Sequence, residues 1–158
     1  NAPMEVQDMP AKELIPFFMS LNKAPFPDVD ELFPLKEKTI STIISHSPVD
    51  GLRLFPKYER LPNAQKLLDD STNAVLGLIE GKNKAYEMGA IVNMLETPGI
   101  ADLPQAKKLI QACKNKLFTD PQMKKLLPAF ANYFSVPFDF LPSHVGDYFY
   151  IFVAALSS

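Results

Sequence analysis

The placement of proline constrains the fold of this chain more than any other feature of its sequence. The 158 residues include 15 prolines, and most of them stand where a helical pattern begins or ends. Proline suits the first turn of a helix, because its missing N–H has no partner to lose there, and it cannot continue a helix interior. The prolines therefore divide the chain into short helices joined by tight links.

Two amphipathic helices are predicted near the start of the chain. The first covers residues 10–21, and the second begins at Pro34 and runs to about Ser45. In each, apolar residues recur at the three- and four-residue spacing of one helical face. Pro16 lies inside the first pattern, so this helix is expected either to kink or to start late. The residues expected on the inner faces are Leu14, Phe17, Phe18, Leu21, Ile40, Ile43 and Ile44.

The stretch from Ser47 to Leu61 breaks this helical spacing. It contains Gly51 and Pro56, which are typical of turns, and no run of alternating residues long enough for a sheet. The sequence predicts an ordered loop that lies across the outside of the fold. Residues 52–55 are its one short strand candidate.

Clearer helices follow in the second half of the chain. They are predicted over residues 62–80, 84–96, 104–117 and 121–134, with a last helix from Ser143 to Leu156. The links between them are short, so consecutive helices are expected to be antiparallel neighbours.

These elements together predict an all-α fold. Six or seven helices are expected to pack as antiparallel hairpins in a single helical domain over residues 1–158, either as an orthogonal bundle or as a short solenoid-like array. The solenoid alternative rests on the similar segments 61–68 (LPNAQKLL) and 103–110 (LPQAKKLI). Independent helix starts are the favoured interpretation, because this motif suits the first turns of any amphipathic helix.

Charge and apolar runs exclude several classes of protein. The formal net charge of −2 gives no field that would gather nucleic acid. Six lysines fall between residues 105 and 125, but those off the apolar stripe are predicted to form a solvated helix face. The apolar run from Tyr148 to Leu156 is about half of the ~20 residues that span a bilayer, so no transmembrane segment is expected. The compartment is left open.

Residues for catalysis or metal binding are scarce. Two histidines, His46 and His144, and one cysteine, Cys113, are present, without a nucleophile elbow or a metal-binding spacing around them. Cys113 lies on an apolar stripe and is predicted to pack in the core. No phosphate-binding glycine loop occurs, so no cofactor and no metal are expected. Binding is favoured over catalysis.

The C-terminal region suggests what is bound. Residues 132–157 hold eight aromatic residues and only two charged ones. We predict a non-enzymatic domain that contacts a partner protein, a second copy of the chain included, through an apolar aromatic groove. The alternative function is a carrier or sensor that holds a small hydrophobic ligand between helices. A structural explanation also stays open, in which the apolar segment from Tyr148 to Leu156 is a central core helix. The candidate binding residues are Phe130, Phe134, Phe138, Phe140, Tyr148, Phe149, Tyr150 and Phe152.

Overall fold

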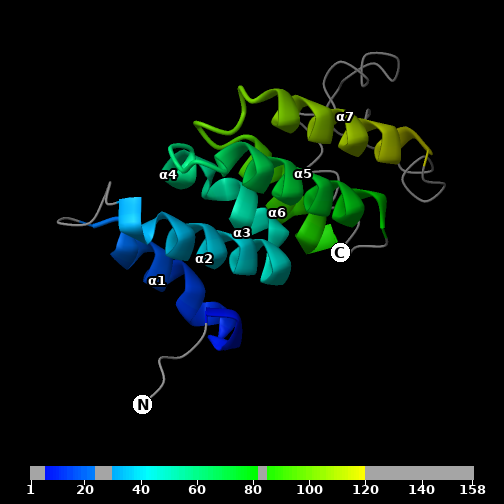
Figure 1. Cartoon of the computed structure of the whole chain (residues 1–158). Coiled ribbons are helices and arrows are strands. Elements are labelled where there is room, and N and C mark those ends of the chain that lie inside the picture. The colour runs from blue at the N-terminus through cyan, green and yellow to red at the C-terminus, as the bar shows by residue number, and fades with distance from the viewer. Residues whose placement is uncertain (1–5, 24–29, 82–84, 120–158) are drawn as a thin grey trace. The chain divides into compact units, whose positions relative to one another are not determined.

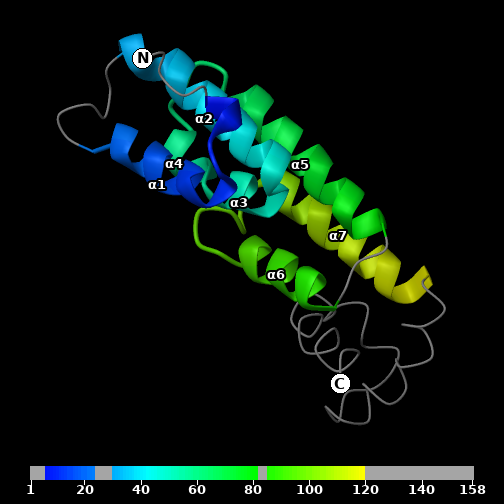
Figure 2. The same cartoon turned by 90° about the horizontal axis from the view of Figure 1, so that it is seen from below.

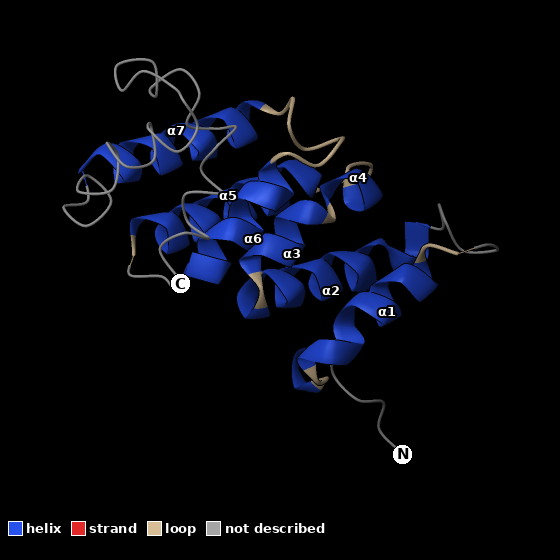
Figure 3. Ribbon diagram, turned by 180° about the vertical axis from the view of Figure 1, so that it is seen from behind, coloured by secondary structure: helices blue, strands red, loops and turns tan. Residues whose placement is uncertain are grey.

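The part of the chain that the structure describes consists of helices and the short loops that join them. The computed structural model describes residues 6–23, 30–81 and 85–119, and these residues contain seven α-helices and no strand (Figures 1 and 3). The all-α prediction is confirmed. The helices are α1 (Ala11–Leu21), α2 (Phe33–His46), α3 (Pro48–Arg53), α4 (Phe55–Tyr58), α5 (Ala64–Glu80), α6 (Ala85–Leu95) and α7 (Pro104–Thr119), with short 3-10 turns at Val6–Asp8 and Asp30–Leu32.

The chain forms two compact units. The first covers residues 1–74 and the second residues 75–158, and the boundary falls inside α5. The single domain expected over residues 1–158 stays a prediction.

The core of the first unit forms around α1 and α2, which lie side by side (Figures 1 and 2). Leu14 and Phe18 are four residues apart on α1 and both are buried, because this spacing places them on one face. Pro16 lies on the exposed side of α1, and the helix already begins at Ala11, so a late start is not observed. The buried apolar cluster contains Val6, Leu14, Phe18, Ile40, Ile43, Ile44, Tyr58, Leu61, Ala64 and Leu67.

The loop predicted between Ser47 and Leu61 is wrong, because this stretch forms α3 and α4. Pro48 and Pro56 stand in the first turns of these two helices, where proline opens a helix instead of ending one. Gly51 lets α3 approach α2 closely, since a Cβ at this position would lie 2.5 Å from Cγ1 of Ile44. The stretch is part of the core: Leu52 and Tyr58 are buried.

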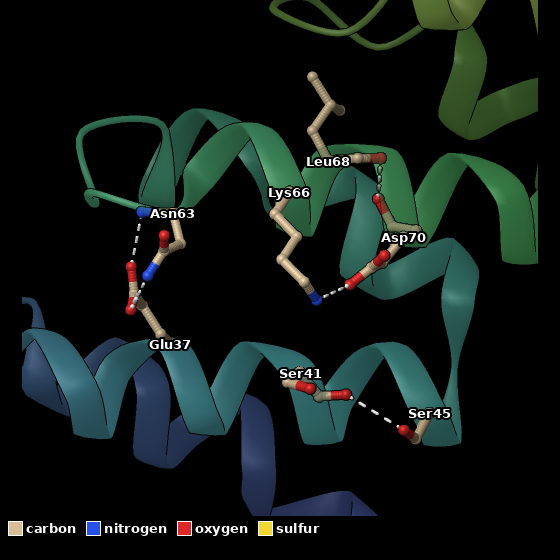
Figure 4. Close-up of polar contacts among 8 residues, drawn as sticks. Glu37, Ser41, Ser45, Asn63, Lys66, Leu68 and Asp70 are labelled. Atoms are coloured by element: carbon tan, nitrogen blue, oxygen red, sulfur yellow. Dashed lines mark hydrogen bonds and ion pairs between the residues drawn. The ribbon is translucent and has the colours of Figure 1, made fainter.

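A polar contact joins α2 to the start of α5 (Figure 4). Asn63 donates its backbone N–H to Glu37 Oε2 at 2.8 Å and its side-chain Nδ2 to Oε1 at 2.9 Å. The carbonyl of Asn63 accepts the N–H of Leu67 at 3.1 Å, so Asn63 stands at the first turn of α5. The Glu37 carboxylate therefore lies at the positive end of the α5 dipole, where a negative charge is stabilising.

The second unit contains the end of α5 together with α6 and α7. Contacts between α6 and α7 bring these two helices together. The Lys116 Nζ on α7 donates to the carbonyl oxygen of Gly81, which directly follows α5, so a cation lies at the negative end of that helix. The buried apolar residues of this unit include Val75, Ile79, Ile91, Val92, Met94, Leu95, Ile100, Ala106, Leu109 and Cys113.

Candidate functional site

The first unit contains a cleft between the end of α1, the first turn of α2 and α4. Its volume is about 340 Å³, at the small end of the range for pockets that hold organic ligands. All its lining residues belong to this one unit. They are Met19, Asn22, Lys23, Phe33, Lys36, Pro56, Lys57, Tyr58, Arg60 and Leu61.

The end of α1 is tied to α4 across this cleft. Asn22 terminates α1; its backbone N–H donates to the carbonyl of Met19 at 3.2 Å, and the N–H of Lys23 donates to the carbonyl of Ser20 at 3.4 Å. Its side-chain Nδ2 donates to the carbonyl oxygen of Lys57 at 3.4 Å. The backbone N–H of Lys57 in turn donates to the carbonyl oxygen of Leu54 at 2.8 Å, which closes the first turn of α4. The Asn22 side chain therefore links the two walls that α1 and α4 provide.

Tyr58 supplies a buried aromatic wall. Its hydroxyl donates to the carbonyl oxygen of Gly51 at 2.9 Å, and its ring forms a T-shaped pair with the Phe55 ring at a centroid distance of 5.4 Å. Burial raises the pKa of Tyr58 to about 12, and a hydrogen bond with the Ser71 side chain lowers it only in part. Tyr58 is therefore a neutral phenol at physiological pH, and its ring adds apolar surface to the cleft.

Lys36 is a buried cation in the cleft wall. Only 1% of the surface of Lys36 is exposed. Its Nζ lies 6.0 Å from the ring centroid of Phe33, which stands one helical turn earlier on α2. A contact of this geometry is weakly attractive. Glu37, the next residue along α2, has its carboxylate engaged by Asn63. Lys36 therefore contributes a buried basic side chain to the wall of the cleft.

The charged side chains among the described lining residues share one sign of charge. Lys23, Lys57 and Arg60 are exposed at its rim, and Lys36 is buried in its wall. The described lining residues include no carboxylate, histidine or cysteine. This arrangement suits binding of a ligand.

The candidate binding residues predicted from the sequence are aromatic residues of its C-terminal region. All of them fall outside the described residues, so their role stays a prediction; they are Phe130, Phe134, Phe138, Phe140, Tyr148, Phe149, Tyr150 and Phe152. His144 also lies outside the described residues. His46 is the exposed last residue of α2, a position that favours a cation beside the carbonyl end of a helix.

The other residues that the sequence singled out, Cys113 and the lysines of α7, have structural positions. Cys113 is buried, and burial raises the pKa of its thiol to about 12, with the nearby Lys116 charge lowering it in part. Such a thiol is a poor nucleophile at neutral pH. Lys107 and Lys108 are exposed on α7, as a solvated face predicts. Within the described ranges no group of three or more metal-ligating side chains comes together.

Sequence reasoning missed the cleft because it treated residues 47–61 as a loop on the outside. Two signals were present. Phe33 and Lys36 are three residues apart and share a helix face, and Lys36 also precedes Ile40 by one turn on the apolar stripe of α2. A lysine on an apolar stripe is unusual enough to mark a candidate site.

Comparison with known proteins leaves the function to be argued from this cleft and from the sequence. Neither family models nor curated proteins nor solved structures provide a match to this chain. Of the helices in the described ranges, none combines the length and the apolar character needed to cross a bilayer.

Proposed function

We propose that this chain is a non-enzymatic helical binding domain that holds a small organic ligand in the cleft of its first unit. The observation that carries this proposal is a cleft of about 340 Å³ with both apolar and cationic walls. Ligand pockets combine apolar surface with a few polar groups that fix orientation. This is the small-ligand alternative of the sequence analysis, moved to residues that the sequence did not single out.

The residues of the cleft support binding more than catalysis. Met19, Phe33 and Leu61 offer apolar surface from three separate segments of the chain. Among the described lining residues, the polar groups are cations and one amide, and the phenol of Tyr58 is already bonded to Gly51. General acid–base chemistry requires a group that exchanges protons near neutral pH, and none of the described lining residues is of a type that ordinarily does so.

A titration followed by NMR tests this proposal. The full chain is titrated separately with octanoate and with octan-1-ol, which have the same chain length and differ in charge. We expect saturable changes in the backbone amide signals of residues 19–23, 33–36 and 57–61 with at least one of them. Dissociation constants in the millimolar range or tighter are expected for probes of about ten heavy atoms.

Two matched variants locate the site. Met19 and Ile15 are both half-buried on α1, one turn apart, and only Met19 lines the cleft. Met19→Trp should fill the cleft and weaken binding at least about tenfold, a loss of about 1.4 kcal/mol, whereas Ile15→Trp should bind as the wild type does. Absence of binding by both probes, or equal weakening by the two variants, would overturn the proposal.

Contact with a partner protein through the C-terminal region stays a second proposal. Its observation is the composition of residues 132–157, in which eight aromatic residues accompany two charged ones. Aromatic residues dominate the binding energy of protein interfaces. A second copy of this chain is the partner that can be tested directly.

Native mass spectrometry at two protein concentrations tests this second proposal. A dimer that grows with concentration is expected, and the variants Phe140→Ser and Tyr150→Ser should shift the equilibrium to the monomer. Lys107→Ser, on the exposed face of α7, is the matched control and should leave the dimer unchanged. A wild-type protein that stays monomeric at both concentrations argues against a homo-oligomer built on these aromatic residues.

A further inference from the structure

We propose that Met19 is an oxidation site in the cleft, and that conversion of its thioether to the sulfoxide weakens ligand binding. This inference rests on the proposed function and adds a form of regulation to it. Three observations carry it: the partial exposure of Met19, its place in the cleft wall and its packing against the buried apolar cluster of the first unit.

The position of Met19 makes it accessible to an oxidant from solvent. The residue is half-buried near the end of α1, and the cleft that it lines has exposed residues, Lys57 and Arg60, at its rim. Exposed sulfur atoms are oxidised before buried ones. Met94, in the second unit, shows the contrast, because its exposed fraction is 0%. A small peroxide can therefore reach Met19 while the fold stays intact.

The reaction transfers one oxygen atom from a peroxide to the sulfur. The Sδ lone pair of Met19 attacks one oxygen of hydrogen peroxide, the O–O bond breaks, and the second oxygen leaves as water with both protons. The sulfur is oxidised by two electrons and the peroxide is reduced by two. Methionine sulfoxide reductases reverse this modification, so it can act as a switch.

The sulfoxide changes the chemistry of the cleft wall. Met19, Phe33 and Leu61 are the residues that offer apolar surface to the ligand from three segments of the chain. Oxidation replaces a flexible apolar group among them by a polar one. The apolar body of a bound ligand would remove the sulfoxide oxygen from water without offering it a donor, which costs free energy. The oxidised cleft should therefore bind an apolar ligand more weakly.

Two other sulfur-containing side chains separate this effect from general oxidation. Met9 is half-buried like Met19 and packs against the same buried cluster, but it does not line the cleft. Its oxidation should leave the cleft unchanged. Cys113 is buried, and its raised thiol pKa keeps the reactive thiolate scarce at neutral pH. Met9 is therefore the matched control for Met19.

The test compares untreated and peroxide-treated protein in the NMR titration with octan-1-ol and octanoate. Peptide mass spectrometry first verifies that Met19 has gained one oxygen atom. Treatment of the wild type should weaken binding roughly tenfold, the effect of covering an unpaired polar group, and a methionine sulfoxide reductase should restore it. Met19→Leu keeps the apolar volume, so it should bind as the untreated wild type does and should lose the response to peroxide. Met9→Leu should retain the response.

A second variant tests the same change without any oxidant. Met19→Gln places an uncharged polar group of similar length in the cleft wall, so it should weaken binding of the probes by a similar factor. Met9→Gln is its control and should bind as the wild type does. Amide spectra recorded without the probe show whether each variant keeps the fold.

The outcomes separate this proposal from the proposed function. Binding of neither probe by the untreated protein would overturn both. Unchanged affinity after Met19 has been oxidised would overturn the oxidation proposal and leave the binding function standing. An equal loss of affinity in treated Met19→Leu would place the sensitive residue elsewhere and overturn the assignment to Met19. A Met19 that stays unmodified while Met9 is oxidised would overturn its accessibility.

Discussion

Replacing Phe18 by alanine should lower the free energy of unfolding of the first unit by about 3–5 kcal/mol. The Phe18 side chain has an exposed fraction of 0% and belongs to the buried cluster that joins α1 and α2. Its removal loses the transfer energy of the ring and leaves a cavity that the neighbouring side chains fill only in part. Urea denaturation followed by circular dichroism measures the loss.

Phe17→Ala is the matched control for this prediction. Phe17 is the preceding residue on the same helix and is only half-buried, so its truncation removes less buried surface and leaves no closed cavity. We expect a loss of roughly 1 kcal/mol, in proportion to the smaller apolar area. If the two variants were equally stable, the packing of α1 described above would be wrong. Each value is to be compared with a total stability of about 5–15 kcal/mol for an ordinary domain.

Raising the pH above 10 should destabilise the first unit through Tyr58. Burial raises the pKa of this phenol from 10.0 to about 12, so the folded protein keeps a proton that the unfolded chain releases. The stabilisation is fully present below pH 10 and is lost as the pH rises through about 12. A difference of two pKa units at about 1.36 kcal/mol each corresponds to a loss of about 2–3 kcal/mol. Urea midpoints measured between pH 8 and pH 12 report this change.

Two variants assign the alkaline transition. Tyr58→Phe should be less stable at neutral pH, by about 1–3 kcal/mol, because the carbonyl of Gly51 loses its donor. Its stability should then fall less steeply with pH than that of the wild type. Cys113→Ala should retain the Tyr58 contribution, since the buried thiol of Cys113, whose pKa is also raised to about 12, belongs to the second unit. Parallel profiles for Tyr58→Phe and the wild type would show that Tyr58 does not titrate as a buried group.

The helices that could be predicted are those long enough to show their own period. Over the eleven residues of α1 or the seventeen of α5, apolar residues recur often enough to reveal one face, and the prolines mark the starts. The helices α3 and α4, with six and four residues, are too short to show a period. In the sequence Pro56 is therefore typical of a turn, although in the structure Pro56 opens α4 and Pro48 opens α3.

The cleft was harder to predict because its walls come together only through tertiary structure. Met19, Phe33 and Arg60 belong to three segments, and no spacing along the chain brings them together. The position of Lys36 on the α2 stripe was readable, since it precedes Ile40 by one turn. The burial of its ammonium group beside Phe33 was not readable, because it depends on how α1 and α4 close around α2.

The contact between Glu37 and Asn63 has a consequence for the order in which the first unit assembles. The amide that opens α5 is satisfied by a carboxylate 26 residues earlier in the sequence, on another helix. A chain in which α2 has not docked lacks this acceptor, so the first turn of α5 frays until the loop between them closes. Exchange of the Asn63 amide is therefore expected to report the opening of α2, which couples the start of α5 to that helix.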